Sequence, residues 1–179
     1  MGKNPSRGVI IMERLIEKAL SLEEKGHKFY IDMAEKASNA LARALFENLA
    51  LDEQRHAEWI QKIQERLQEE YPTDSAGAGI SIKDRIREVF ENLDTAEEKP
   101  GQETVRGLEI AMQLEKEALE LYGELLELDP SPAEKAFLEK IMQQEWQHLE
   151  ALRNVHFYLT RTGEWFDEEE SQRWNWMNI

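Results

Sequence analysis

Hydrophobic residues recur at steps of three and four along most of the chain, the spacing that places them on one face of an α-helix. The pattern predicts four long helices, and a capping-box-like start at Ser81 predicts a shorter one between the second and the third. The expected bounds are roughly 9–36, 40–70, 82–93, 103–128 and 132–160. Because two of the connections are short and one is long, the sequence predicts an all-α fold of two antiparallel hairpins joined by a crossover.

The two short connections carry residues that favour helix starts. Ser38 and Asn39 supply N-cap side chains between the first two long helices. In the second short connection, Ser131 is the expected N-cap, with Pro132 in the first turn and Glu134 completing a capping box. Both hairpins are therefore expected to turn tightly.

The second half of the chain repeats the first without gaps at an offset of 92 residues. The identical pairs are Glu17/Glu109, Ala19/Ala111, Leu22/Leu114, Glu23/Glu115, Tyr30/Tyr122, Ala44/Ala136, Glu47/Glu139, Glu53/Glu145, His56/His148 and Glu58/Glu150. We therefore expect a ferritin-like four-helix bundle over residues 1–162, in which two copies of one hairpin are related by a pseudo-twofold axis. A Trp-rich tail over 163–179 is expected to dock on its own domain or, by preference, at a dimer contact.

Charged residues interrupt the apolar faces of the long helices at matched places. Glu53 and His56 lie on the apolar face of the second long helix, and the repeat places Glu145 and His148 in the same way on the last. A Glu-x-x-His spacing puts a carboxylate and an imidazole about one helical turn apart, where both can bind one cation. The first and third long helices each add an inward Glu, at Glu23 and Glu115.

The spacing of these residues predicts that they meet. Glu23 and Glu53 are 30 residues apart with their midpoint in the first short turn, and Glu115 and Glu145 are 30 residues apart with their midpoint in the second. Each Glu is therefore about 15 residues, or about 22 Å, from its turn. The six side chains are expected in one layer of the bundle.

Composition restricts the chemistry of such a layer. The chain has 179 residues and no Cys, which excludes disulfides, thiol nucleophiles and thiolate metal sites. Its 22 Lys and Arg against 37 Asp and Glu give a net charge of −15, which argues against nucleic acid and anionic membranes as partners. No apolar run is long enough for a signal peptide or a membrane span, so we expect a soluble, cytoplasmic protein.

Four carboxylates in an apolar bundle would cost several kcal/mol per ion unless they were paired or protonated. Two divalent cations would cancel their charge. One Glu from each of two helices with Glu-x-x-His from the other two is the ligand set of di-iron and di-manganese carboxylate bundles. The oxygen and nitrogen donors suit iron or manganese, and zinc could occupy the same site.

Four segments resemble the rubrerythrin group of ferritin-like di-iron proteins: LEEKGHKFY at 22–30, EQRHA at 53–57, LEKEALELY at 114–122 and EWQH at 145–148. The resemblance extends over about residues 12–160. It implies a carboxylate-bridged di-iron centre that reacts with hydrogen peroxide or dioxygen, often in homodimers. It also implies roles for the six residues, which would be both the metal ligands and the catalytic residues: Glu53 and Glu145 bridge, Glu23 and Glu115 are terminal ligands, and His56 and His148 bind one iron each.

The chain departs from this group in two ways. The additional Glu that the resemblance implies one turn along the third long helix is absent, since the candidate positions hold Met112 and Ala118. The Cys-rich rubredoxin domain is also absent, so a separate, rubredoxin-like electron donor is expected.

Several neighbouring residues have two interpretations. The hydroxyls of Tyr30 and Tyr122 either hydrogen-bond to the carboxylates of metal ligands and orient them, or the two residues are ordinary core aromatics. Asp52 and Gln144 either orient an imidazole or lie on a solvated face. His27 and His156 are not duplicated and are expected to be structural or exposed, and Gly26 is expected to serve helix packing rather than to open a path for an oxidant.

The leading functional prediction is a di-iron peroxidase or oxidase with two iron ions per chain and an external donor. One alternative is an iron-handling protein that oxidises Fe(II) for storage or buffering, which would need a closed shell of subunits. Another is a structural metal bundle, with zinc, that binds a partner protein.

Overall fold

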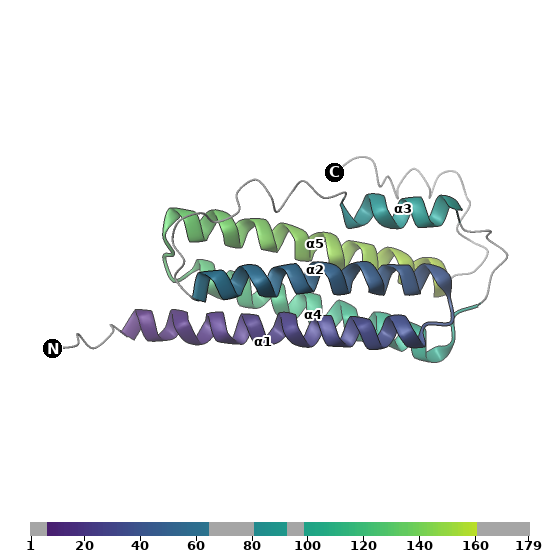
Figure 1. The fold of residues 1–179 in the computed structure, drawn as a ribbon, viewed down its shortest axis with the longest axis horizontal. Coiled ribbons are helices and arrows are strands. Elements are labelled where there is room, and N and C mark those ends of the chain that lie inside the picture. The colour runs from purple at the N-terminus through teal and green to yellow at the C-terminus, as the bar shows by residue number, and fades with distance from the viewer. Residues whose placement is uncertain (1–6, 65–80, 93–98, 161–179) are drawn as a thin grey trace.

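The computed structural model describes residues 7–64, 81–92 and 99–160 as a bundle of long helices (Figure 1). The helices are α1 (Arg7–Lys36), α2 (Ala40–Gln64), α3 (Ile82–Asn92), α4 (Gln102–Leu126) and α5 (Pro132–Thr160). α1 packs with α2 and α4 packs with α5 as antiparallel hairpins, and the hairpins meet through α1 with α4 and α2 with α5. The predicted all-α four-helix bundle with a crossover helix is confirmed.

Helix bounds agree with the sequence prediction to within two residues, apart from the expected second helix, whose last residues lie outside the described part of the chain: α1 begins at Arg7, two residues before its expected start. α4 stops at Leu126, two residues before its expected end, because the chain tightens there: the N–H of Leu128 bonds to the carbonyl of Leu125 at 3.3 Å. Asp129 then adopts a left-handed conformation with φ of 54°. Residues 65–70 of the expected second helix, and the tail over 163–179, lie outside the described residues.

The predicted caps start three of the helices. The N–H of Ala42 donates to Asn39 Oδ1 at 3.1 Å, and the N–H of Asp84 donates to Ser81 Oγ at 3.2 Å. At α5 the capping box is complete, because Glu134 N–H donates to Ser131 Oγ at 3.4 Å and Ser131 N–H donates to Glu134 Oε2 at 2.8 Å. Local chemistry therefore fixes where α2, α3 and α5 begin.

Two apolar clusters fill the bundle. One contains Tyr30, Leu45, Phe46, Leu49, Leu108 and Leu152, together with Ile82 and Ile86 of α3. The other contains Ala19, Ile60, Tyr122, Leu125, Phe137 and Ile141. On every long helix the predicted site residues lie between the stretch that enters the first cluster and the stretch that enters the second. The polar layer is therefore enclosed by core at both ends.

The crossover helix α3 lies along α2 and α5, on the side of the bundle away from α1 and α4 (Figure 1). Ile82 and Ile86 are buried, and Val89 packs against the same cluster, so one face of α3 is anchored in the core. In the described parts of the chain, no helix is long and apolar enough to cross a membrane.

Candidate metal centre

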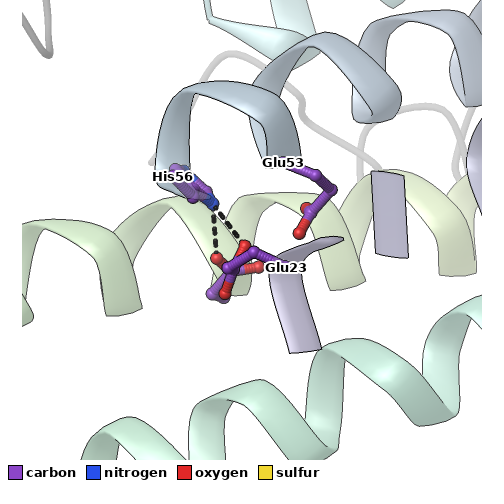
Figure 2. Close-up of side chains that lie close together, drawn as sticks. Glu23, Glu53 and His56 are labelled. Atoms are coloured by element: carbon purple, nitrogen blue, oxygen red, sulfur yellow. Dashed lines mark ion pairs between the residues drawn. The ribbon is translucent and has the colours of Figure 1, made fainter. Parts of the chain in front are cut away.

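The structure brings all six predicted ligand residues together. All six residues are buried, each with no more than 5% of its residue surface exposed: Glu23, Glu53, His56, Glu115, Glu145 and His148. Figure 2 shows His56 and Glu53 reaching from one helix toward Glu23 on another. The equal distances from the hairpin turns, deduced from the sequence, account for this common layer.

The six residues form two overlapping groups of potential metal donors. One group is Glu23, Glu53, His56 and Glu145, and the other is Glu53, Glu115, Glu145 and His148. In each group, four donor atoms lie within 4.8 Å of one another. Glu53 and Glu145 belong to both groups, as a carboxylate that contacts two ions must.

Both imidazoles turn Nδ1 toward the carboxylates. His56 Nδ1 lies 3.3 Å from Glu23 Oε2 (Figure 2) and 2.7 Å from Glu145 Oε1. His148 Nδ1 lies 3.3 Å from Glu53 Oε1, 3.3 Å from Glu145 Oε2 and 3.6 Å from Glu115 Oε2. The two rings stack with their centroids 5.5 Å apart. Each nitrogen thus faces several carboxylate oxygens at once.

Close approach in this cluster does not amount to hydrogen bonding. Six buried atoms form no hydrogen bond with any residue that the structure describes: Glu23 Oε2, Glu53 Oε1, His56 Nδ1, Glu145 Oε1, Glu145 Oε2 and His148 Nδ1. Buried polar atoms normally have a partner, and leaving one without is costly. Carboxylate oxygens and imidazole nitrogens that converge without bonding to one another are suited to bind a pair of divalent cations. The residues present therefore fit a metal site.

The outer nitrogen of each imidazole is held from the opposite Glu-x-x-His helix. His56 Nε2 lies 3.0 Å from Gln144 Oε1, and His148 Nε2 lies 3.4 Å from Asp52 Oδ2. Asp52 and Gln144 each precede a shared Glu and are equivalent in the repeat. The structure therefore favours the orienting role over the solvated face for both residues.

Two tyrosines hold the remaining carboxylates across the bundle. The Tyr30 hydroxyl donates to Glu115 Oε1, and the Tyr122 hydroxyl donates to Glu23 Oε1. Both rings are buried. These bonds link α1 to α4 in both directions, so the pseudo-twofold relation of the sequence repeat extends to the hydrogen bonds around the cluster.

Comparison with known proteins agrees with this geometry. A family model described as Rubrerythrin matches residues 14–156, most of the chain. The chain belongs to the rubrerythrin family. Membership in this family, with a buried cluster of four Glu and two His, indicates a di-iron carboxylate protein. No curated protein matches the chain.

A solved structure shows the same fold. It is a two-domain protein from Anabaena variabilis ATCC 29413, described as containing DJ-1/ThiJ/PfpI-like and ferritin-like domains. The TM-score is 0.61 at 18% identity, and the match covers 84% of this chain and 37% of that protein. The ferritin-like architecture expected from the sequence is thereby confirmed for this rubrerythrin-family chain.

Burial and mutual repulsion govern the protonation of the carboxylates in the rubrerythrin-family site. Burial and the negative charge of Glu145 raise the pKa of Glu115 to about 8. Burial and the charges of Glu23 and Glu145 raise the pKa of Glu53 well above its ordinary value. Burial would also raise the pKa of Glu145, but His56 and His148 hold it well below the usual range. Without metal, the cluster therefore retains protons that cations would displace.

The imidazoles and Asp52 complete this electrostatic picture. Burial disfavours a charged His56, yet the negative charges of Glu145 and Glu23 raise its pKa to about 10. Burial would raise the pKa of Asp52, but its contacts with His148 and Arg85 lower it to about 2. Asp52 is thus an anion throughout the physiological range.

Other residues of the sequence analysis take structural places. His27 Nδ1 lies 2.7 Å from the carbonyl oxygen of Ala50, and His156 Nε2 lies 3.7 Å from Glu109 Oε1. A Cβ on Gly26 would lie 3.2 Å from Glu53 Oε2, so this glycine makes room for the Glu53 carboxylate. That contact agrees with the packing interpretation.

The positions one turn either side of Glu115 offer no additional carboxylate to this family member. Ala118 is buried in one apolar cluster, and Met112 packs against the other. As the sequence indicated, α4 therefore provides no additional Glu one turn from Glu115.

Sequence reasoning missed Arg85. Its guanidinium pairs with Asp52 Oδ2 from the crossover helix. The capping box at Ser81 located α3 but contains no information about which long helix α3 covers, so the partner of Arg85 could not be deduced from spacing.

Proposed function

We propose that the protein is a di-iron oxidoreductase that reduces hydrogen peroxide or dioxygen with electrons from an external, rubredoxin-like donor. The observation that carries the proposal is the pair of four-residue donor groups sharing two carboxylates in a member of the rubrerythrin family. When bound, two ferrous ions would supply the two electrons that, with two protons, convert one hydrogen peroxide into two water molecules.

The two donor groups support a role for each ligand residue. Glu53 and Glu145, common to both groups, would bridge the ions. Glu23 and His56 would bind one ion, and Glu115 and His148 the other, a division that places one carboxylate and one imidazole on each. The same donors could hold manganese or zinc.

The surrounding residues fix these ligands before any reaction. Tyr30 and Tyr122 keep their protons, since burial first and then the nearby carboxylate charges raise the pKa of both hydroxyls well above the ordinary value. Each hydroxyl can therefore donate steadily to Glu115 or Glu23. The apolar clusters at both ends of the layer exclude water from it.

An external donor is proposed because the 179 residues contain no Cys for a rubredoxin iron and no Gly-rich dinucleotide fingerprint. Oxidation should therefore stop after one event when the chain is alone. The homodimer and the cytoplasmic location stay predictions from the sequence.

Stopped-flow spectroscopy of the chemically reduced, iron-loaded protein tests the proposal. We expect one oxidation event per pair of irons, faster with hydrogen peroxide than with dioxygen, and repeated turnover only after a rubredoxin-like donor and its reductase are added. The His56→Ala variant, which removes one proposed ligand, is the matched control and should lose this reaction. Lack of oxidation by either oxidant would contradict the proposal and favour the structural metal bundle, whereas a closed shell in light scattering would favour iron storage.

A further inference from the structure

We propose that Asp52, held by Arg85 of the crossover helix, is a positioning residue that makes the two metal positions inequivalent. The position bound by His148 should have the higher affinity, and it should fill first. This inference rests on the proposed two-metal site, but its test can fail while that site stands.

The inference begins from a place beside the cluster where the repeat breaks. Asp52 and Gln144 are related by the offset of 92 residues, and each contacts Nε2 of the opposite imidazole. The contact with His148 is therefore made by a carboxylate, and that with His56 by a neutral amide. The two contacts have the same arrangement, but only the one with His148 involves a charged partner.

The difference matters because the hydrogen-bond partner of Nε2 determines whether Nδ1 is free to bind a metal and how strongly it binds. An ionised carboxylate only accepts hydrogen bonds, so Nε2 of His148 carries a proton, and in the neutral imidazole that would bind a metal Nδ1 keeps its lone pair for the ion. Negative charge on the acceptor also makes the imidazole a stronger donor to a metal. Gln144 Oε1 can select the same tautomer in His56, but it supplies no net charge.

Arg85 fixes Asp52 in this place. Asp52 Oδ2 accepts from Arg85 Nη2 while facing His148, and Asp52 Oδ1 lies 2.7 Å from Arg55 Nη2. The Arg85 side chain is 20% exposed and that of Arg55 is 43% exposed, so the pair with Arg85 is the less screened by water.

The position of Arg85 follows from the topology. α3 is anchored through Ile82 and Ile86, which sit on either side of Arg85 in sequence and enter the core cluster. α3 lies against α2 (Figure 1), the helix that contains Asp52. The crossover joins the hairpins once, so a duplicated bundle acquires a residue that acts on one half only. A cation held in the same way at Gln144 would have no negative charge to pair with.

Stepwise titration of the metal-free protein with Co²⁺, followed by absorbance and calorimetry, tests the inference. We expect two binding steps that differ by about tenfold or more, the scale on which outer-shell partners alter metal affinity. The tight step should persist in His56→Ala and disappear in His148→Ala. In Asp52→Asn the tight step should weaken by about tenfold, bringing the two steps together, while the weak step changes much less.

A reciprocal variant keeps the test decisive if Asp52→Asn fails to fold. Gln144→Glu places a carboxylate against His56 and should strengthen the weak step by about tenfold. Gln143→Glu adds the same charge at the neighbouring position of α5, which is exposed to solvent, and should leave the two steps nearly unchanged. If position 144 had only a structural role, Gln144→Glu would not increase the metal affinity of the weak step.

Three results would overturn the inference. They are equal steps in the unaltered protein, equal weakening of both steps in Asp52→Asn, and equal effects of the charge at 143 and at 144. Each of these leaves the two-metal site intact. If the unaltered protein bound no Co²⁺ at all, both the inference and the proposed function would fail.

Discussion

Gly26 shows how closely single residues are fitted around the cluster. A Cβ at this position would lie 3.2 Å from Glu53 Oε2, closer than ordinary van der Waals contact. We expect Gly26→Ala to weaken metal binding by about tenfold, because it displaces a carboxylate proposed to bridge both ions. The metal-free protein should not lose stability, since Ala is favoured over Gly inside a helix by about 1 kcal/mol. Metal titration and denaturant unfolding measure the two effects separately.

Gly123 provides the matched control for this substitution. It lies in α4, and a Cβ there would meet no atom of the described residues within 4 Å. Gly123→Ala should therefore show the gain in helix stability without a change in metal affinity. If the two alanine variants bound metal equally well, the proposed role of the Glu53 carboxylate beside Gly26 would be wrong.

The protonation of individual ligands predicts opposite pH responses with and without metal. In the metal-free protein, the pKa of Glu115 is raised from 4.5 to about 8, and that of His56 from 6.5 to about 10. A raised pKa in the folded state stabilises the fold below the ordinary pKa, and this contribution is lost as the pH rises through the folded value. The free energy of unfolding of the metal-free protein should therefore fall between about pH 5 and pH 10.

Metal binding reverses this trend, because the cations displace the same protons and bind better as the pH rises. Chelation should therefore lower the melting temperature more at about pH 8.5 than at about pH 6. Thermal unfolding at the two pH values, with and without chelator, checks the prediction. An effect of chelator that did not depend on pH would argue against these residues as the ligands.

At the scale of elements, the helices were predictable because the information that specifies them is local. Apolar spacing and the side chains at Asn39, Ser81 and Ser131 fixed three helix starts. The end of α4 was placed two residues late, because the turn at Leu128 and Asp129 depends on backbone geometry that apolar spacing does not report. The surface covered by α3 was not predictable either, since it depends on how the crossover runs over the finished bundle.

The capping box of α5 offers a test that separates the fold from the site. Ser131→Ala removes the acceptor for the N–H of Glu134 and should cost about 1 kcal/mol of stability. Metal affinity should not change, because the box begins α5 more than three helical turns before Glu145. Denaturant unfolding of metal-free protein and Co²⁺ titration measure the two quantities. If the free energy of metal binding fell by about as much as the free energy of unfolding, the site would be coupled to this turn.

At the scale of the whole molecule, duplication explains why most of the site could be predicted. One offset of 92 residues placed Glu115, Glu145 and His148 once their partners in the first half were identified. The same symmetry reappears in the crossed bonds from Tyr30 and Tyr122. What spacing could not predict is the asymmetry, because the contact between Asp52 and Arg85 is made by the crossover, which has no copy in the repeat.

The central claim is that the buried layer of four Glu and two His binds two metal ions. Its most direct test is the metal-to-chain ratio, measured by native mass spectrometry and elemental analysis after anaerobic loading with Fe(II) and removal of the excess. We predict two ions per chain in the unaltered protein, and one in each of His56→Ala and His148→Ala. A folded protein that retained no iron, or histidine variants that still retained two tightly bound ions, would contradict the claim.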